Sequence, residues 1–159
     1  MKTILVPTDF SKISNNAVDY ASKMALITNA KLILLNVYHI PAMPTEVPVV
    51  IPDVESFERD SKENHTKLKQ RLFLSYGKTI EVDLVSKCGF AAEEISSYAD
   101  TINPDIIIMG ITGTNYVTER VFGSVATSVV EYCNYPVLLV GDGIEFKAPR
   151  KIALACDYN

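Results

Sequence analysis

Short apolar runs alternate with longer helical patterns along most of this chain. Strands are predicted at residues 4–6, 31–40, 79–86, 105–109 and 136–140. Apolar side chains recur at helical spacing between them, which predicts helices at residues 11–29, 56–76, 90–102 and 125–133. Strands that alternate with helices pair in parallel through right-handed crossovers. The chain is therefore predicted to be an α/β protein, a three-layer sandwich around a five-stranded, doubly wound parallel sheet.

The order of the strands decides where a ligand can bind. A doubly wound sheet of this size takes the order 3-2-1-4-5, in which the chain reverses direction between the first and fourth strands. Residues 79–86 alternate between apolar and polar, as in an edge strand, whereas 105–109 is almost continuously apolar and should be central. The order predicts a crevice between two loops, residues 7–11 (PTDFS) and 110–124 (GITGTNYVTERVFGS).

The second of these loops is rich in glycine. It contains Gly110, Gly113 and Gly123, and Ser124 stands near the predicted start of the next helix. A helix N-terminus presents unpaired N–H groups and the positive end of the helix dipole, which together stabilise an anion. Gly110 and Gly113 are predicted to let the backbone approach a ligand and turn through positive φ, and Ser124 to cap the helix or bind a phosphate oxygen. A connector without a ligand is the alternative, and neither GxxxxGKS/T nor GxGxxG occurs.

Composition narrows the class of partner. The net charge of −4 and the absence of a Lys/Arg cluster argue against nucleic acid. No apolar run reaches the roughly 20 residues that span a bilayer. Pro7 and Asp9 interrupt the first apolar run too early for a signal peptide. A cytoplasmic protein without a membrane segment is therefore expected.

The cysteines and histidines do not have the spacing of a metal site. The three cysteines lie far apart without a CxxC pair, and His39 and His65 supply no ligand spacing. These side chains are expected to be core thiols and surface imidazoles.

Four stretches together resemble the nucleotide-binding branch of the universal stress protein family. They are ILVPTDFS (4–11), INPDIIIMG (102–110), the spacing Gly110-x2-Gly113-x9-Gly123-Ser124, and YPVLLV (135–140). The resemblance extends over residues 2–141. It implies a fold like that of the adenine nucleotide alpha-hydrolases, with ATP bound in the crevice together with Mg or Mn.

The same resemblance implies a role for each matching position. Pro7, Thr8 and Asp9 would meet the nucleoside, and the backbone of Val37 would meet the adenine edge. Met109, Gly110 and Gly113 would line the ribose and the phosphates. Gly123, Ser124 and Val125 would hold the phosphates at the start of the helix. Arg120 is the one basic residue in the x9 segment, so phosphate binding would rest on backbone amides.

Several alternatives stay open from the residues alone. Asp9 could cap the first helix instead of touching a ligand. A nucleotide-binding regulatory protein is favoured, with a weak ATP hydrolase and a structural dimeriser as alternatives. Neither loop contains a His or Cys that could act as base or nucleophile, so slow hydrolysis is the most that is expected. A phospho-accepting receiver domain is excluded, because the third strand does not end in Asp nor the fifth in Lys.

The chain is predicted to contain one domain and the start of another. Residues 1–141 form the domain, 142–150 a linker, and 151–159 the beginning of a truncated second copy. The last ten residues, RKIALACDYN, match KTILVPTDFS at residues 2–11, with Ile152 in the place of Ile4 and Asp157 in that of Asp9.

The last strand presents an apolar edge that is open to another chain, formed by Val137, Leu138, Leu139 and Val140. The family resemblance implies a homodimer through this strand.

Overall fold

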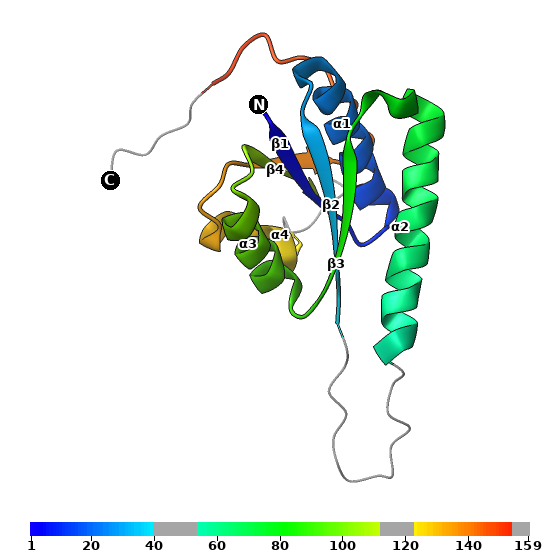
Figure 1. Ribbon diagram of the computed structural model, residues 1–159. Coiled ribbons are helices and arrows are strands. Elements are labelled where there is room, and N and C mark those ends of the chain that lie inside the picture. Colours follow the sequence, from blue (N-terminus) through cyan, green and yellow to red (C-terminus); the bar gives the residue numbers. More distant parts are fainter. Residues whose placement is uncertain (40–53, 112–122, 154–159) are drawn as a thin grey trace, which may run out of the picture.

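The sheet has the predicted order, β3-β2-β1-β4-β5. The computed structural model describes residues 1–39, 54–111 and 123–153 (Figure 1). Its strands are β1 (Thr3–Pro7), β2 (Lys31–Tyr38), β3 (Val82–Cys88), β4 (Ile106–Ile111) and β5 (Val137–Gly141). All neighbouring strands pair in parallel. The predicted fold class is confirmed, with β1 at the centre and β3 and β5 at the edges.

Helices cover both faces of the sheet (Figure 1). They are α1 (Lys12–Thr28), α2 (Val54–Tyr76), α3 (Ala91–Ile102) and α4 (Ser124–Tyr132), with a short 3-10 helix, η1 (Gly77–Thr79), after α2. One core lies between the sheet and helices α1 and α2, and a second lies between the sheet and helices α3 and α4. The predicted three layers are therefore present.

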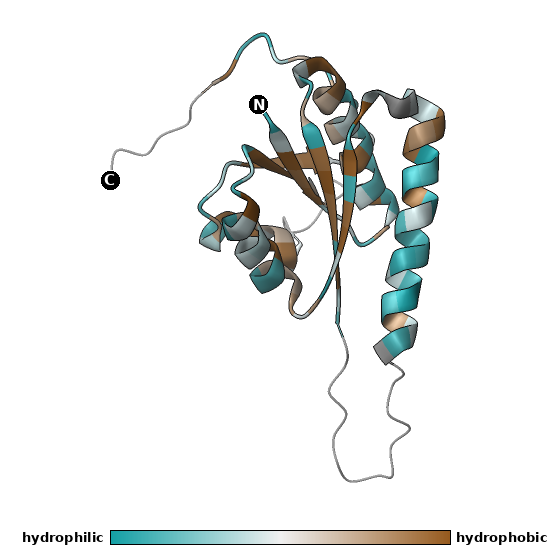
Figure 2. Cartoon of the chain, in the orientation of Figure 1, coloured by the Kyte–Doolittle hydropathy of each residue, from teal (hydrophilic) through white to brown (hydrophobic). Residues whose placement is uncertain are grey.

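The hydropathy of the strands explains their burial. Figure 2 shows apolar residues along the strands and a mostly polar surface on α2. Ile107 and Ile108 in β4 are fully buried, as expected for a central strand. Helix α2 buries Leu68 and Leu72 against the sheet, whereas Phe57 at its start is half-buried.

Three element ends are set by residues in the left-handed region. Gly77 has φ +67° where α2 ends, the conformation for which glycine is favoured after a helix. Asn29 and Asn103 close α1 and α3 with φ of 51° and 46°. The predicted bounds of the third strand were wrong, because Thr79 belongs to η1 and the strand begins at Val82.

Helical spacing does not fix burial on α3 and α4. The pattern aligns Phe90, Val125 and Tyr132 with the inward positions of residues 90–102 and 125–133, yet these side chains are 62%, 38% and 74% exposed. Helix α4 buries Ala126 and Val129.

Asp105 joins the start of β1 to the start of β4. Its Oδ2 accepts hydrogen bonds from the backbone N–H of Lys2 (2.6 Å) and Thr3 (2.8 Å). The hydrogen bonds from Thr3 and Lys2 hold the pKa of the Asp105 carboxyl below its usual value. This side chain secures the pairing of two strands that are far apart in sequence.

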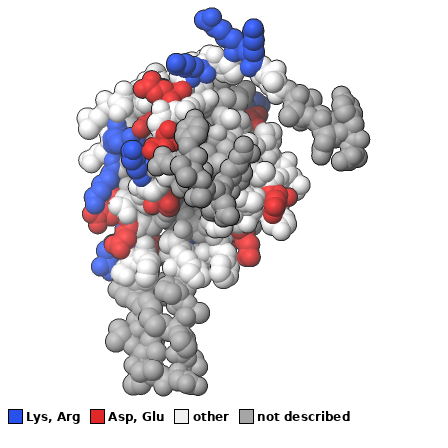
Figure 3. All heavy atoms as spheres, turned by 180° about the vertical axis from the view of Figure 1, so that it is seen from behind, with Lys and Arg blue, Asp and Glu red and all other residues white. Residues whose placement is uncertain are grey.

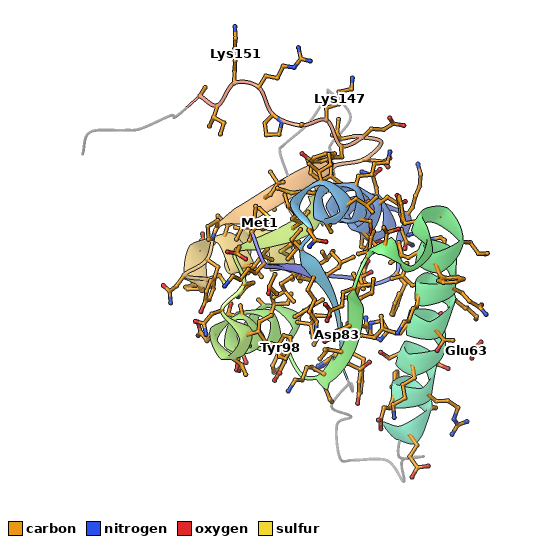
Figure 4. The ribbon with its side chains drawn as sticks, turned by 45° about the horizontal axis from the view of Figure 1, so that its top comes forward. Met1, Glu63, Asp83, Tyr98, Lys147 and Lys151 are labelled. Atoms are coloured by element: carbon orange, nitrogen blue, oxygen red, sulfur yellow. The ribbon has the colours of Figure 1, made fainter. Side chains whose placement is uncertain are left out.

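The segment after β5 contacts α1. The Asn16 side-chain amide donates to the carbonyl of Gly141 (2.9 Å), and the rings of Tyr20 and Phe146 pack edge to face at 5.0 Å. Beyond these contacts, Lys147 and Lys151 extend from the segment, away from the sheet (Figure 4). Residues 154–159, most of the predicted start of a second copy, lie outside the described residues.

Basic and acidic side chains are interspersed on the face shown in Figure 3, and further basic side chains project from the C-terminal segment. None of the described helices combines the length and apolar character needed to cross a membrane. The absence of a nucleic-acid partner stays a prediction.

Candidate ligand-binding site

A cavity of about 290 Å³ lies at the carboxyl ends of β1, β2 and β4. This is the place predicted from the change of direction in a doubly wound sheet. Its walls come from the strand ends and from the first turns of α1, α3 and α4. The lining residues are Pro7, Thr8, Asp9, Ser11, Ile13, Ser14, Leu35, Val37, Ala91, Ile95, Met109, Gly110, Gly123, Ser124, Val125 and Ala126.

Every described member of the predicted site set lies in this wall. The members are Pro7, Thr8, Asp9, Val37, Met109, Gly110, Gly123, Ser124 and Val125. Gly113 and Arg120 lie outside the described residues. Residues from both ends of the predicted crevice are thus brought into one cavity.

Some residues of the wall, among them Leu35, Ala91, Ile95 and Ala126, were not among the predicted site residues. Leu35 precedes Val37 by two residues in β2, so strand alternation could have placed both on the same face. Ala91 and Ile95 lie one helical turn apart in α3, a spacing that shares one face. Nothing in the sequence indicated that this face of α3 meets the ends of β1 and β2.

The turn between β1 and α1, residues 8–11, is called the site turn below. The Thr8 N–H donates to the carbonyl of Leu35 (2.8 Å), and Thr8 Oγ1 accepts from the N–H of Phe10 (3.0 Å). Phe10 has φ 61°, a left-handed conformation that is rare for a bulky residue. Such a residue costs on the order of 1–3 kcal/mol and persists only where its neighbours fix it.

Asp9 belongs to the site turn rather than to a helix cap. Its Oδ1 accepts from the N–H of Ser11 (3.0 Å), whereas Ser11 is the N-cap residue of α1 and accepts from the N–H of Ser14 (3.2 Å). Partial burial acts to raise the pKa of the Asp9 carboxyl, but hydrogen bonds from Ser11 and Ser14 outweigh it and the pKa lies below its usual value. Asp9 is therefore a carboxylate at neutral pH, and it carries the one titratable side chain among the described lining residues.

The N-terminus of α4 forms another part of the cavity wall. Gly123 is its N-cap residue and offers no side-chain hydrogen bond to the first turn. The prediction that Ser124 caps the helix was wrong, because Ser124 is the first helical residue; its exposed hydroxyl lies at the cavity instead. No described side chain caps this first turn, and N–H groups that lack a cap can bind an anion.

The wall between β2 and α3 is apolar. Leu35 and Val37 line it from the strand, and Ala91 and Ile95 line it from the helix. None of these four side chains can form a hydrogen bond. A flat apolar ring fits such a wall, with its polar edge left to backbone groups.

Gly110 shapes the floor of the cavity. It continues β4 and does not have a positive φ, so the prediction that it turns the chain was wrong. A Cβ at this position would lie 2.8 Å from the carbonyl oxygen of Ile13. Glycine is needed here because β4 approaches the first turn of α1 closely.

The histidine and cysteine predictions are partly wrong. His65 is buried rather than on the surface, with 3% of its area exposed. Cys88 is exposed rather than in the core, Cys133 is half-buried, and Cys156 lies outside the described residues. Within the described parts of the chain, no three His, Cys, Asp or Glu side chains gather in a way that could hold a metal ion.

Comparison with known proteins finds relatives over most of the chain. Residues 1–141 match the model of the Universal stress protein family. Universal stress protein Sll1654 of Synechocystis sp. is 33% identical over 142 residues, which cover 87% of this chain and 85% of that protein. Universal stress protein MJ0577 of Methanocaldococcus jannaschii is 30% identical over 152 residues, covering 87% and 94%.

Solved structures share the fold. Universal stress protein UspA from Lactobacillus plantarum matches with a TM-score of 0.72 and 25% identity, over 87% of this chain and 97% of that one. A universal stress protein in complex with cAMP matches with a TM-score of 0.63 and 21% identity, over 89% and 98%. The universal stress protein from Archaeoglobus fulgidus in complex with dAMP matches with 0.61 and 16%, over 87% and 97%.

Proposed function

The chain belongs to the universal stress protein family, and from this membership and its cavity we propose that it binds ATP and acts as a nucleotide-dependent regulatory module. The observation that carries the proposal is the meeting, in one cavity, of an uncapped helix N-terminus and an apolar slot. Two proteins of this fold were solved with adenine nucleotides, cAMP and dAMP, which supports the choice of base.

The phosphate groups are assigned to the start of α4. Gly123 leaves the first-turn N–H groups without a side-chain cap, and the Ser124 hydroxyl can donate to a phosphate oxygen. The start of α1 is a poorer anion site, because Ser11 caps it and the Asp9 carboxylate already accepts the N–H of Ser11.

The adenine ring is assigned to the apolar slot. Leu35, Val37, Ala91 and Ile95 provide faces against which a purine can pack, and a backbone strand edge can satisfy its ring nitrogens. Pro7, Thr8 and Asp9 would then contact the nucleoside between the apolar slot and the start of α4. A carboxylate there can accept hydrogen bonds from ribose hydroxyls.

A divalent ion, Mg or Mn, is proposed to accompany the triphosphate. Such an ion would be held by phosphate oxygens and water, as Mg²⁺ is when it accompanies a nucleotide. The ion would offset the repulsion between the triphosphate and Asp9.

We also propose that the protein assembles through β5. This strand lies at the edge of the sheet, and Val130 and Tyr132 on the neighbouring helix α4 are exposed. A second copy of this chain would pair with the edge. If residues 151–159 begin a second domain, as their match to the first strand suggests, that domain would occupy the same edge within one chain.

The test begins with the purified protein and no added nucleotide. The protein is denatured, the supernatant is analysed by ion-pair chromatography with mass detection, and ATP with Mg is then titrated into the wild type. The informative variant is Ser124→Glu, since a carboxylate in the first turn favours the helix but repels phosphate. It is expected to lose ATP binding by about tenfold or more while α4 stays folded.

Thr127→Glu is the matched control, because it adds the same charge to the same helix at an exposed residue outside the cavity wall. It is expected to bind ATP nearly as the wild type does. A wild type that neither releases nor binds an adenine nucleotide would leave the structural dimeriser as the better proposal.

A further inference from the structure

A chain of hydrogen-bonded polar side chains, buried except for the partly buried Ser86, runs behind the site turn from helix α2 through β3 to β2. The Ser61 hydroxyl donates to Asn36 Oδ1 (2.7 Å), and Asn36 Nδ2 donates to the carbonyl of Thr8 (2.8 Å). The Ser61 and Ser86 hydroxyls lie 2.8 Å apart, and Ser86 Oγ lies 3.2 Å from His65 Nδ1. The chain thus ends on a residue that lines the cavity.

The hydrogen bonds of this chain can be donated in only one direction. The carbonyl of Thr8 can only accept, which fixes the amide of Asn36. Ser61 donates its single proton to Asn36, so Ser86 must donate to Ser61. Ser86 then has no proton for His65, and the Nδ1–H of His65 must donate to Ser86. His65 therefore carries a proton on Nδ1, and burial, which lowers the pKa of the imidazole, favours the neutral form. Its buried Nε2 has no partner among the described residues.

His65 also reaches the site turn by a second route. The ring of Phe10 packs edge to face on the imidazole, with centroids 5.2 Å apart and an interplanar angle of 81°. Phe10 is the residue in the left-handed conformation, and the side-chain amide of Asn15 donates to its carbonyl (2.9 Å). A strained residue of this kind keeps its conformation only where the surroundings hold it.

We propose that His65 is a positioning residue for the cavity, which holds the site turn in its ligand-lining shape through the ring of Phe10 and through the hydrogen-bonded chain to Thr8. Its effect on ligand affinity rests on the proposed function, whereas its effect on the turn does not. Helix α2 contributes no described residue to the cavity wall, so this assigns a role at the site to a helix that does not touch it.

Two variants separate the parts of this arrangement. His65→Phe keeps a ring beside Phe10 and removes the Nδ1–H donor, and Ser61→Ala keeps His65 and breaks the chain at one hydroxyl. The matched control is Ser22→Ala. Ser22 is fully buried in α1, donates to the carbonyl of Val18 (2.7 Å) and lies outside the cavity wall, so it also loses one buried hydrogen bond.

The first measurement needs no ligand. Amide hydrogen exchange of Phe10 and Ser11 is followed by NMR in the four folded proteins. Exchange at these two amides is expected to be roughly fivefold faster in His65→Phe and Ser61→Ala than in the wild type or Ser22→Ala, the size expected from one lost hydrogen bond. Equal rates in all four proteins would overturn the proposal, as would an Nε2–H tautomer of His65 in long-range nitrogen-proton spectra.

The second measurement is the affinity for ATP with Mg. It is expected to fall roughly fivefold in His65→Phe and Ser61→Ala and to stay unchanged in Ser22→Ala. An unchanged affinity in the first two variants, with a wild type that binds, would also overturn the proposal. A wild type that binds no ATP would refute the proposed function. The exchange rates alone would then test whether His65 holds the site turn in place.

Discussion

Gly110 in β4 lies against Ile13 in the first turn of α1, and a Cβ on Gly110 would stand 2.8 Å from both the carbonyl oxygen and the Cγ2 of Ile13. Because one of these atoms is backbone, a side chain could be accommodated only by a shift of the strand or the helix. Gly110→Ala is therefore expected to lower the free energy of unfolding by about 1–3 kcal/mol, as measured by urea denaturation.

The control for this substitution is Gly141→Ala in β5. A Cβ there would meet Ile144 Cγ1 at 3.4 Å, an ordinary contact with a side chain. Its effect on the free energy of unfolding is expected to stay within about 0.5 kcal/mol. An equal loss in both variants would mean that the approach of Gly110 to Ile13 is not the cause.

Ala91→Leu tests the apolar slot. Ala91 is half-buried at the first position of α3, and a larger side chain would enter the cavity. The variant is expected to bind adenosine and ATP about tenfold more weakly, whereas Ser124→Glu should weaken ATP and leave adenosine unchanged. NMR titration with both ligands checks this, with Ser97→Leu on the exposed side of α3 as control. An undiminished adenosine affinity in Ala91→Leu would refute the assignment of the base.

Removal of the divalent ion is expected to weaken the binding of ATP more than the binding of AMP. Asp9 is the one titratable side chain among the described lining residues, and it is acidic. The Asp9 carboxylate therefore repels a triphosphate without a bound cation more strongly than it repels AMP. Addition of EDTA should weaken ATP binding by roughly tenfold and AMP binding by less than twofold in isothermal titration calorimetry. Equal loss for both nucleotides would contradict this account.

His65 is expected to make stability depend on pH. Burial lowers the pKa of its imidazole below the ordinary value of about 6.5. Between pH about 6.5 and the lower pKa of the folded protein, the imidazole of the unfolded chain takes up a proton and that of the folded chain does not. The neutral imidazole therefore contributes its full stabilisation above pH about 6.5, and this contribution is lost as the pH falls through the folded pKa.

Urea denaturation between neutral pH and pH 5 measures this dependence. His65→Phe should flatten the pH profile, and Ser22→Ala, which removes a buried hydrogen bond but no titratable group, should keep the slope of the wild type. A wild-type slope in His65→Phe would assign the dependence to other groups.

Leu139→Pro tests assembly through β5. The N–H of Ile107 donates to the carbonyl of Pro136 (2.9 Å), so alternate residues of β5 face β4 and the N–H of Leu139 points to the open edge. Proline is tolerated on edge strands but removes that donor. Light scattering should show a dimer for the wild type and a monomer for the variant, with circular dichroism to verify the fold. A monomeric wild type would refute the dimer.

Strand order and much of the cavity wall could be predicted because they depend on short local patterns. The apolar run after Asp105 indicated a central strand, and the proline after Val6 and the glycine after Met109 marked two strand ends at one edge of the sheet. In a parallel sheet such ends meet whatever the details of packing.

Burial on the helices could not be predicted in the same way. His65 lies on a helix whose mean hydropathy is low, and its burial depends on Ser86, a partner from a strand that comes later in the chain. Likewise Ala91 reaches the cavity because α3 packs against β2 with its first residue beside the ends of the strands. Such positions follow from how elements pack together rather than from the pattern within one element.

Strand β1 is the first of the strands to be synthesised and yet lies at the centre of the sheet. Ile4 pairs with Leu32 on one side and with Ile106 on the other. A growing chain on the ribosome can complete the first pairing early, but one flank of β1 stays bare until β4 emerges. The cavity needs α4 as well, and so it forms only once Ala126 has been made. A ligand that needs the whole of this wall can therefore bind only chains whose synthesis has passed Ala126.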